Sequence, residues 1–382
     1  MEPTFTATPR RSASSALLAA AVGILLVVLL GSAIFGPSSN PVMVTGLSAP
    51  RGLTPTEEGG LLIAEVGAGR LLEMSPDGKI SVIADGLPYS PVSGPGQYPA
   101  GPSAVVKRNS HYYTVIGEHF VPGFSEMYRL EPGDDPEPVT GQEIVNRFGT
   151  NPLTNPYDLV PTADGGFLVS DSGINAILYI SEDGEISEYV TFPERENPEP
   201  LNGFSEIDVV PTGMDRGPDG AVYVASLTGF PYPTGAALVY RLEDADSTSG
   251  GTFTVFADGF TTATDVVVDV DGSLLVTEFS SDLASLERDQ DIRDAAQLPG
   301  RLVRWIDGEI TVVAEGLVSP TSVAVVDDRI FVSEEYAGRV SEVVEGSASS
   351  PRTEPWLLFL AIFWVAFTIL GMLWWRRRAA QR

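Results

Sequence analysis

The sequence contains no cysteine and only two histidines among its 382 residues. Without cysteine the chain has no disulfide framework, no thiol nucleophile and no cysteine-based zinc or iron–sulfur site. Basic residues are also scarce, because 23 Lys and Arg stand against 51 Asp and Glu, for a formal net charge of −28. A phosphate backbone must be met by clustered Lys and Arg, so this balance argues against nucleic acid as a partner.

Two long segments near the ends of the chain lack charged residues altogether. They cover residues 16–35 and residues 356–375. At 1.5 Å rise per residue a helix of this length measures about 30 Å, which matches the hydrocarbon core of a bilayer. Tryptophan at both ends of the second segment fits an interfacial aromatic belt. We therefore predict two transmembrane helices, the first of which is alternatively a cleaved signal peptide with its site at Gly31–Ala33.

The basic residues that flank these segments predict their orientation. Arg10 and Arg11 precede the first segment, and Arg376–Arg378 follow the second. Because positive residues stay on the cytoplasmic side, both termini are expected in the cytoplasm. Residues 40–350 hold 49 acidic and 16 basic side chains, and we expect them on the extracytoplasmic side of the cell membrane.

These observations predict six parts along the chain. They are a cytoplasmic tail (1–15), a transmembrane helix or signal anchor (16–35), an exported domain (42–345), a linker (346–355), a second transmembrane helix (356–375) and a basic cytoplasmic tail (376–382).

The exported domain is built from repeats. An apolar strand that usually closes on an acidic residue recurs at 61–65, 167–171, 222–226, 274–278 and 330–334. The apolar residue inside the preceding strand recurs at spacings of 52, 54, 55, 52 and 57, at Leu53, Val105, Leu159, Met214, Val266 and Val323. A period of roughly 40–50 residues is typical of propeller blades, and six units are counted.

Asp-Gly pairs mark the turns within these units. They lie at 77–78, 164–165, 183–184, 219–220, 271–272 and 307–308. Asp-Gly between alternating apolar residues is a strong hairpin signal, with positive φ expected at both residues. Six antiparallel meanders in succession predict an all-β, six-bladed β-propeller. The last unit has three clear strands, so we predict that Val42–Thr45 completes it and closes the ring.

Two stretches interrupt the period. The loop Pro88–Pro102 is rich in Pro and Gly, and the segment Ser281–Gly300 is charged. Insertions of this length are either lids over a site or solvated decoration, and the sequence favours neither.

Four stretches carry a resemblance to a known family. They are residues 210–242, 45–53, 155–180 and 258–278, of which Leu227–Pro231 is the most specific. Together they resemble the ScyD/ScyE family of β-propeller proteins over roughly residues 42–345. The resemblance implies the propeller fold and an exported location. Its generic repeats are also similar to NHL-type and gluconolactonase-like six-bladed propellers. A second hydrophobic anchor after the propeller departs from the family pattern.

In such a propeller, the loops that enter the innermost strand and those that leave the second strand meet over one mouth of the central channel. The candidate ligand-binding residues at this mouth are Arg51, Glu65, Asp158, Asp171, Thr212, Ser226, Asp265, Glu278, Thr321 and Glu334. Six of these are carboxylates and therefore candidate metal ligands, namely Glu65, Asp158, Asp171, Asp265, Glu278 and Glu334.

A ring of carboxylates repels itself unless it is protonated, hydrated or neutralised by a cation. Hard oxygen ligands suit Ca²⁺, as in the gluconolactonase-like and phosphotriesterase-like propellers that this architecture resembles. The alternative is a solvated acidic rim in which Asp and Glu cap loop amides. Neither His111 nor His119 falls in a recognisable nucleophile motif, so the sequence favours a binding module over an enzyme.

Two functions from different classes follow. The first is a membrane-anchored propeller that binds a small-molecule or protein ligand at one face. The second is a calcium-dependent hydrolase or lactonase that uses carboxylates at the channel mouth. The stretch Thr228–Pro233 could present aromatic rings to such a ligand or could fix a blade edge.

Overall fold

The computed structural model describes residues 40–91, 98–117, 124–132, 137–139, 153–198, 204–246, 248, 250–283, 299–345 and 347–348. Both predicted transmembrane segments and their tails lie outside these residues, as do His119 and most of Ser281–Gly300. A search of the described residues finds no helix with the length and hydrophobicity of a membrane span.

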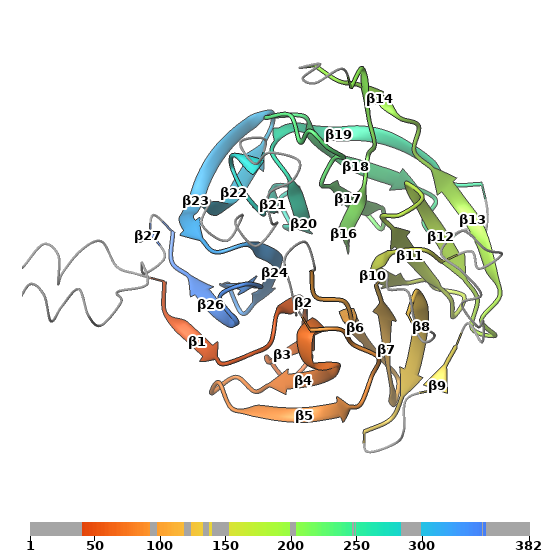
Figure 1. Cartoon of the computed structure of the whole chain (residues 1–382), viewed down its shortest axis with the longest axis vertical. Helices are drawn as coiled ribbons and strands as arrows, with labels where there is room; N and C mark the ends of the chain where they lie inside the picture. The colour runs from red at the N-terminus through yellow and green to blue at the C-terminus, as the bar shows by residue number, and fades with distance from the viewer. Residues whose placement is uncertain are drawn as a thin grey trace, which may run out of the picture. The chain divides into compact units, whose positions relative to one another are not determined.

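Six sheets, each built from an antiparallel meander, are arranged around a common centre, as Figure 1 shows. The all-β, six-bladed propeller predicted from the repeats is therefore confirmed. The innermost strands are β2, β6, β10, β16, β20 and β24. They contain the six apolar residues from Leu53 to Val323 whose spacing defined the repeat.

The strands of each blade follow one another along the chain. Blade 1 has β2 (Pro50–Pro55), β3 (Leu61–Glu65), β4 (Arg70–Met74) and β5 (Ile80–Asp85), with a short 3₁₀ turn η1 (Val66–Ala68). Blade 2 has β6 (Pro102–Arg108), β7 (His111–Ile116), β8 (Glu126–Leu130) and β9 (Glu137–Pro138). Blade 3 has β10 (Pro156–Pro161), β11 (Phe167–Asp171), β12 (Ala176–Ile180) and β13 (Ile186–Thr191). Blade 4 has β16 (Pro211–Arg216), β17 (Val222–Ser226), β18 (Ala237–Glu243) and β19 (Thr252–Phe260). Blade 5 has β20 (Ala263–Val268), β21 (Leu274–Glu278), β22 (Gly300–Ile306) and β23 (Glu309–Leu317). Blade 6 has β24 (Pro320–Val326), β25 (Arg329–Glu334) and β26 (Arg339–Val343).

The outermost strand of blade 6 comes from the other end of the domain. Strand β1 (Val42–Thr45) pairs antiparallel with β26. Two further hydrogen bonds join the ends, from Glu342 N to the Pro41 carbonyl at 2.8 Å and from Val344 N to Asn40 Oδ1 at 3.1 Å. The predicted ring closure by this strand is confirmed.

Short strands outside the six meanders complete the sheet structure. β14 (Arg195–Glu196) pairs with β15 (Glu206–Ile207) between blades 3 and 4. β27 (Ser347–Ala348) lies in the segment expected to be a linker and pairs in parallel with the outer strand β23. The chain that leaves blade 6 therefore runs along the edge of blade 5.

The hydrophobic core is divided among the six junctions between neighbouring blades, and each junction holds one cluster of buried side chains. The strand β3 shows how a sheet serves two junctions. Leu61 and Ile63 pack toward blade 6, whereas Leu62 and Ala64 pack toward blade 2. Both faces of the strand are buried, which explains why it reads as a continuous apolar run.

The Asp-Gly turns differ from the expectation in one respect. Positive φ at both residues occurs at Asp307–Gly308, where Ile306 pairs with Glu309 across a two-residue turn. The other five connections are longer, and there the glycine alone has positive φ. In these turns the glycine N–H bonds back three residues, as Gly78 does to Ser75 at 2.8 Å. The longer loop needs a left-handed residue at one position only.

Candidate functional site

A single position near the start of each innermost strand sets the width of the channel. Register with the second strands makes the equivalent residues Arg51, Ser103, Tyr157, Thr212, Thr264 and Thr321. The four hydroxyl residues donate to backbone carbonyls of the next blade, as Thr212 Oγ1 does to Ala263 at 3.1 Å. Blades 1 and 3 instead place a large side chain at this level.

These two large side chains meet in the channel. The Arg51 guanidinium lies over the Tyr157 ring, with 5.5 Å between the guanidinium carbon and the ring centroid. Arg51 Nε and Nη2 donate to the two carboxylate oxygens of Glu335 at 3.0 and 3.1 Å. Arg51 and Tyr157 line the cavities on both sides of this level. They therefore form a partition between two chambers.

Five aromatic side chains are among the residues that line the chamber at the mouth where the innermost strands begin. We call it the aromatic cup, defined by Tyr98, Tyr157, Tyr232, Phe279 and Tyr336. Its volume is about 300 Å³. Small-molecule sites are concave and mostly apolar with a few placed polar groups, and span about 300–1,000 Å³. The cup lies at the lower end of that range.

Backbone hydrogen bonds hold the walls of the cup in place. The connection between β17 and β18 is tied to the segment before β16, because Thr228 N donates to the Val209 carbonyl at 3.2 Å and Gly229 N to Asp208 at 3.0 Å. Of the two rings in Thr228–Pro233, Tyr232 lines the cup, whereas Phe230 packs against Phe204 and Tyr232. Tyr232 packs in one apolar cluster with Phe279 and Tyr336, whose rings lie edge to face, 6.3 Å apart between centroids.

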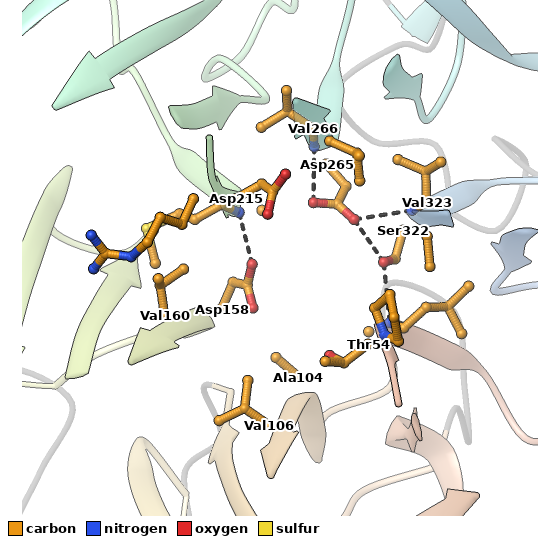
Figure 2. Close-up of a pocket in the computed structure, with 18 of the residues that line it drawn as sticks. Thr54, Ala104, Val106, Asp158, Val160, Asp215, Asp265, Val266, Ser322 and Val323 are labelled. Carbon is orange, nitrogen blue, oxygen red and sulfur yellow. Dashed lines mark hydrogen bonds between the residues drawn. The ribbon is translucent and has the colours of Figure 1, made fainter. Parts of the chain in front are cut away.

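Four aspartates line the chamber on the other side of the partition, and three of them come from the innermost strands of three neighbouring blades. We call this cavity of about 650 Å³ the acidic chamber, defined by Asp158, Asp215 and Asp265. Figure 2 shows the three side chains around the channel. Burial raises the pKa of Asp158 to about 7 and that of Asp215 to about 6. Burial, and then repulsion from Asp158, also raises the pKa of Asp265.

Each of these carboxylates accepts hydrogen bonds from the backbone of the next blade. Asp158 Oδ2 accepts from Met214 N at 2.7 Å, and Asp215 Oδ2 accepts from Val268 N at 2.8 Å. Asp265 Oδ2 accepts from Val323 N at 3.0 Å and from the Ser322 hydroxyl at 2.6 Å, as Figure 2 shows. These acids join blades 3, 4, 5 and 6 in succession.

The four remaining predicted carboxylates close the second strands and are buried between blades. Glu65, Asp171, Glu278 and Glu334 have no exposed side-chain surface. They accept hydrogen bonds from amides of the loops that lead into their blades, namely Ser48 N, Thr154 N, Thr261 N and Val318 N. Glu65, Glu278 and Glu334 also bind Arg70, Arg301 and Arg339 of the third strands. They cap loop amides, but they are buried between blades, whereas the alternative interpretation expected a solvated rim.

The sequence-predicted residues are thus distributed over three places rather than one mouth. Arg51, Thr212 and Thr321 lie at the partition level, and Asp158 and Asp265 lie in the acidic chamber. Ser226 takes the place of the second-strand carboxylate in blade 4, where its hydroxyl bonds Leu238 of β18. A search of the described residues finds no group of three His, Asp or Glu side chains arranged to hold one metal ion.

Sequence analysis missed Tyr157, Asp215, Glu335 and Tyr336. A β-bulge near the start of every innermost strand explains the first omission, because the register shifts there, as between Pro156 and Asp158. Consecutive residues such as Tyr157 and Asp158 therefore both reach the channel. The repeat itself carried the signal, since Tyr157 follows a proline just as Arg51 and Thr321 do.

No protein-family model and no curated protein matches the sequence. Solved structures with a similar fold include a gluconolactonase of Xanthomonas campestris, at 14% identity and a TM-score of 0.52, covering 80% of this chain and 88% of that one. A calcium-binding regucalcin of Agrobacterium tumefaciens has 14% identity and a TM-score of 0.48, with 82% and 97% coverage. Virginiamycin B lyase of Staphylococcus aureus has 15% identity and a TM-score of 0.46, with 80% and 98% coverage. The first of these supports the six-bladed propeller fold and nothing finer.

The acidic chamber predicts a pH dependence of stability. Carboxyls with raised pKa bind protons more tightly in the folded than in the unfolded protein, so the free energy of unfolding falls as pH rises from about 4 to about 7. We expect full-length protein to resist urea less at pH 8 than at pH 5. Each group contributes a slope of at most about 1.4 kcal/mol per pH unit.

Asp215→Asn keeps an acceptor for Val268 N and removes one titrating group, so it should make the slope shallower. Asp271→Asn is the matched control, because hydrogen bonds in its exposed turn lower the pKa of Asp271 instead. Equal slopes in the two variants would contradict the assignment to the acidic chamber.

Proposed function

We propose that this protein is a membrane-anchored, extracytoplasmic binding module that holds a small-molecule ligand in the aromatic cup. The observation that carries the proposal is the convergence of Tyr98, Tyr157, Tyr232, Phe279 and Tyr336 on one cavity at a channel mouth. Aromatic side chains supply large contact areas at low conformational cost, and a propeller presents them on a rigid frame. A cavity of this kind fits a small molecule better than a protein surface.

The segment that carries the resemblance to the ScyD/ScyE family most specifically lies beside the same cup. This segment, Leu227–Pro231, begins with a residue that lines the cup and leads directly into Tyr232. On this proposal the segment shapes the wall of the binding site, and the chain is a ScyD/ScyE-type propeller.

Membrane anchoring is proposed from the sequence. The two uncharged segments 16–35 and 356–375 have the length of bilayer spans, and arginines flank their outer ends. This arrangement supports a propeller exported from the cytoplasm and tethered at both ends.

Replacement of a cup residue tests the binding function. We expect aromatic fragments that bind full-length protein in a ligand-observed NMR screen to lose about tenfold or more in affinity in Phe279→Ala, because this ring forms one wall. Phe256→Ala is the matched control, since Phe256 packs on Tyr223 and Trp305 at the outer part of blades 4 and 5, away from the cup. If the fragments bind both variants with equal affinity, the cup is not their binding site.

The cysteine-free sequence allows a clean test of topology. Val270 is 88% exposed, so Val270→Cys introduces a single reactive thiol on the propeller. We expect a membrane-impermeant maleimide to label it in intact cells, whereas Gln381→Cys should be labelled only after permeabilisation. Labelling of Gln381→Cys in intact cells would place the C-terminus outside and defeat the proposed orientation.

A calcium-dependent hydrolase or lactonase is the second candidate, favoured by the three carboxylates that define the acidic chamber. The donors there do not fit a metal centre well, because each carboxylate already accepts backbone hydrogen bonds and no described group of three is arranged around one ion. We therefore derive no catalytic step through a metal, and this function stays a prediction from the sequence.

Calcium titration separates the two candidates. For a binding module we expect Ca²⁺ and Mg²⁺ to have equal effects on the melting temperature and on calorimetric heats. A calcium-specific rise in melting temperature that Asp158→Asn and Asp265→Asn both abolish would favour the hydrolase. Turnover of lactone or phosphotriester substrates that a chelator stops would establish it.

A further inference from the structure

The floor of the aromatic cup carries one positive and one negative charge that are fixed to each other. The Arg51 side chain is 15% exposed and that of Glu335 is 4% exposed. Two parallel hydrogen bonds join them, which is the geometry that gives an Arg–carboxylate pair its strength and direction. The chain also fixes Glu335 through its backbone, because Glu335 N donates to the Ser319 carbonyl at 3.0 Å.

This pair leaves the floor without net charge, and that condition discriminates among ligands. An anionic ligand would compete with Glu335 for Arg51 and would also face the carboxylates of the acidic chamber behind the partition. A cationic ligand would lie against Arg51, which already occupies the face of the Tyr157 ring where a cation would bind. A ligand of either charge would be desolvated without a free partner of opposite sign among the described residues that line the cup.

Tyr157 adds a polar group at the same level. Its hydroxyl is buried and has no hydrogen-bond partner in the described part of the chain. Burial raises the pKa of Tyr157 well above its ordinary value, so the side chain is a neutral phenol. A buried hydroxyl without a partner is unfavourable, and a ligand group that hydrogen-bonds to it removes that cost.

We propose that the Arg51–Glu335 pair makes the aromatic cup selective for neutral aromatic ligands that carry an uncharged hydrogen-bonding group, with Glu335 as the residue that excludes anions. This inference rests on the proposed binding function and names the ligand class of that site. Tyr157 binds the uncharged polar group, and the remaining rings of the cup enclose the aromatic body.

Four probes that share one ring system test the selectivity. They are naphthalene, 2-naphthamide, 2-naphthoate and 2-naphthylmethylammonium, titrated calorimetrically into the full-length protein in lipid nanodiscs, with empty nanodiscs as the blank. We expect 2-naphthamide to bind about tenfold or more tightly than either charged probe. Tyr157→Phe should weaken 2-naphthamide and leave naphthalene unchanged.

Changes at the floor should move the preference in a defined order. Glu335→Gln leaves Arg51 uncompensated and should shift the affinity ratio about tenfold toward 2-naphthoate. Arg51→Gln should shift it toward the ammonium probe. The double variant removes both charges and should restore the preference for 2-naphthamide, which also controls for loss of folding in a single variant.

The outcomes distinguish a failure of the proposed binding function from a failure of the proposed selectivity. If wild-type protein binds none of the four probes, the binding function proposed for the cup fails. Suppose instead that naphthalene binds and that Phe279→Ala abolishes this binding. The selectivity is then wrong, although the binding function stands, if a charged probe binds as tightly as the amide. The same conclusion follows if Glu335→Gln leaves the affinity ratio unchanged.

Discussion

Hydrogen bonds between the innermost strands of neighbouring blades are the constraint on which this propeller depends. Each innermost strand has a sheet partner on one side and faces the channel on the other, where its amides would otherwise be buried without partners. Side chains from the preceding blade accept from these amides. Asp158 accepts from an amide of blade 4, Asp215 from one of blade 5 and Asp265 from one of blade 6. For blade 1 the acceptor is Ser322 of blade 6, whose hydroxyl accepts from Leu53 N at 3.1 Å.

This arrangement explains why aspartates of the innermost strands gather around the acidic chamber. A carboxylate can accept from two amides at once, so one short side chain joins a strand of its own blade to the next. The space is tight enough that a Cβ on Gly213 would lie 2.1 Å from Asp265 Oδ1. Burial of the three aspartates disfavours their ionisation, and the amide hydrogen bonds only partly offset that effect. Many of the acidic residues that suggested a metal ring in the sequence therefore accept hydrogen bonds from backbone amides.

The repeat, the blade count and the closing strand could all be predicted from sequence, because each depends on a periodic pattern of apolar residues and turns. The site could not be assembled in the same way. Bulges in the innermost strands place consecutive residues such as Tyr157 and Asp158 in the channel, and alternation alone does not anticipate a register shift. Glu334 and Glu335 show the same limit. They are adjacent in sequence, yet the first clamps a loop to Arg339 and the second meets Arg51 at the floor of the cup.

The hydrogen bond between Val344 and Asn40 brings the two ends of the propeller within one residue's reach of each other. An apolar cluster fills the seam between the last blade and the first, as at the other five junctions, and β1 pairs with β26 as the outermost strand of blade 6. A circularly permuted chain, with these ends joined and a new opening made in a turn between strands, would keep the full set of blade contacts. The junction at which the termini lie would then depend only on where the gene begins and ends, because the ring of blades is closed.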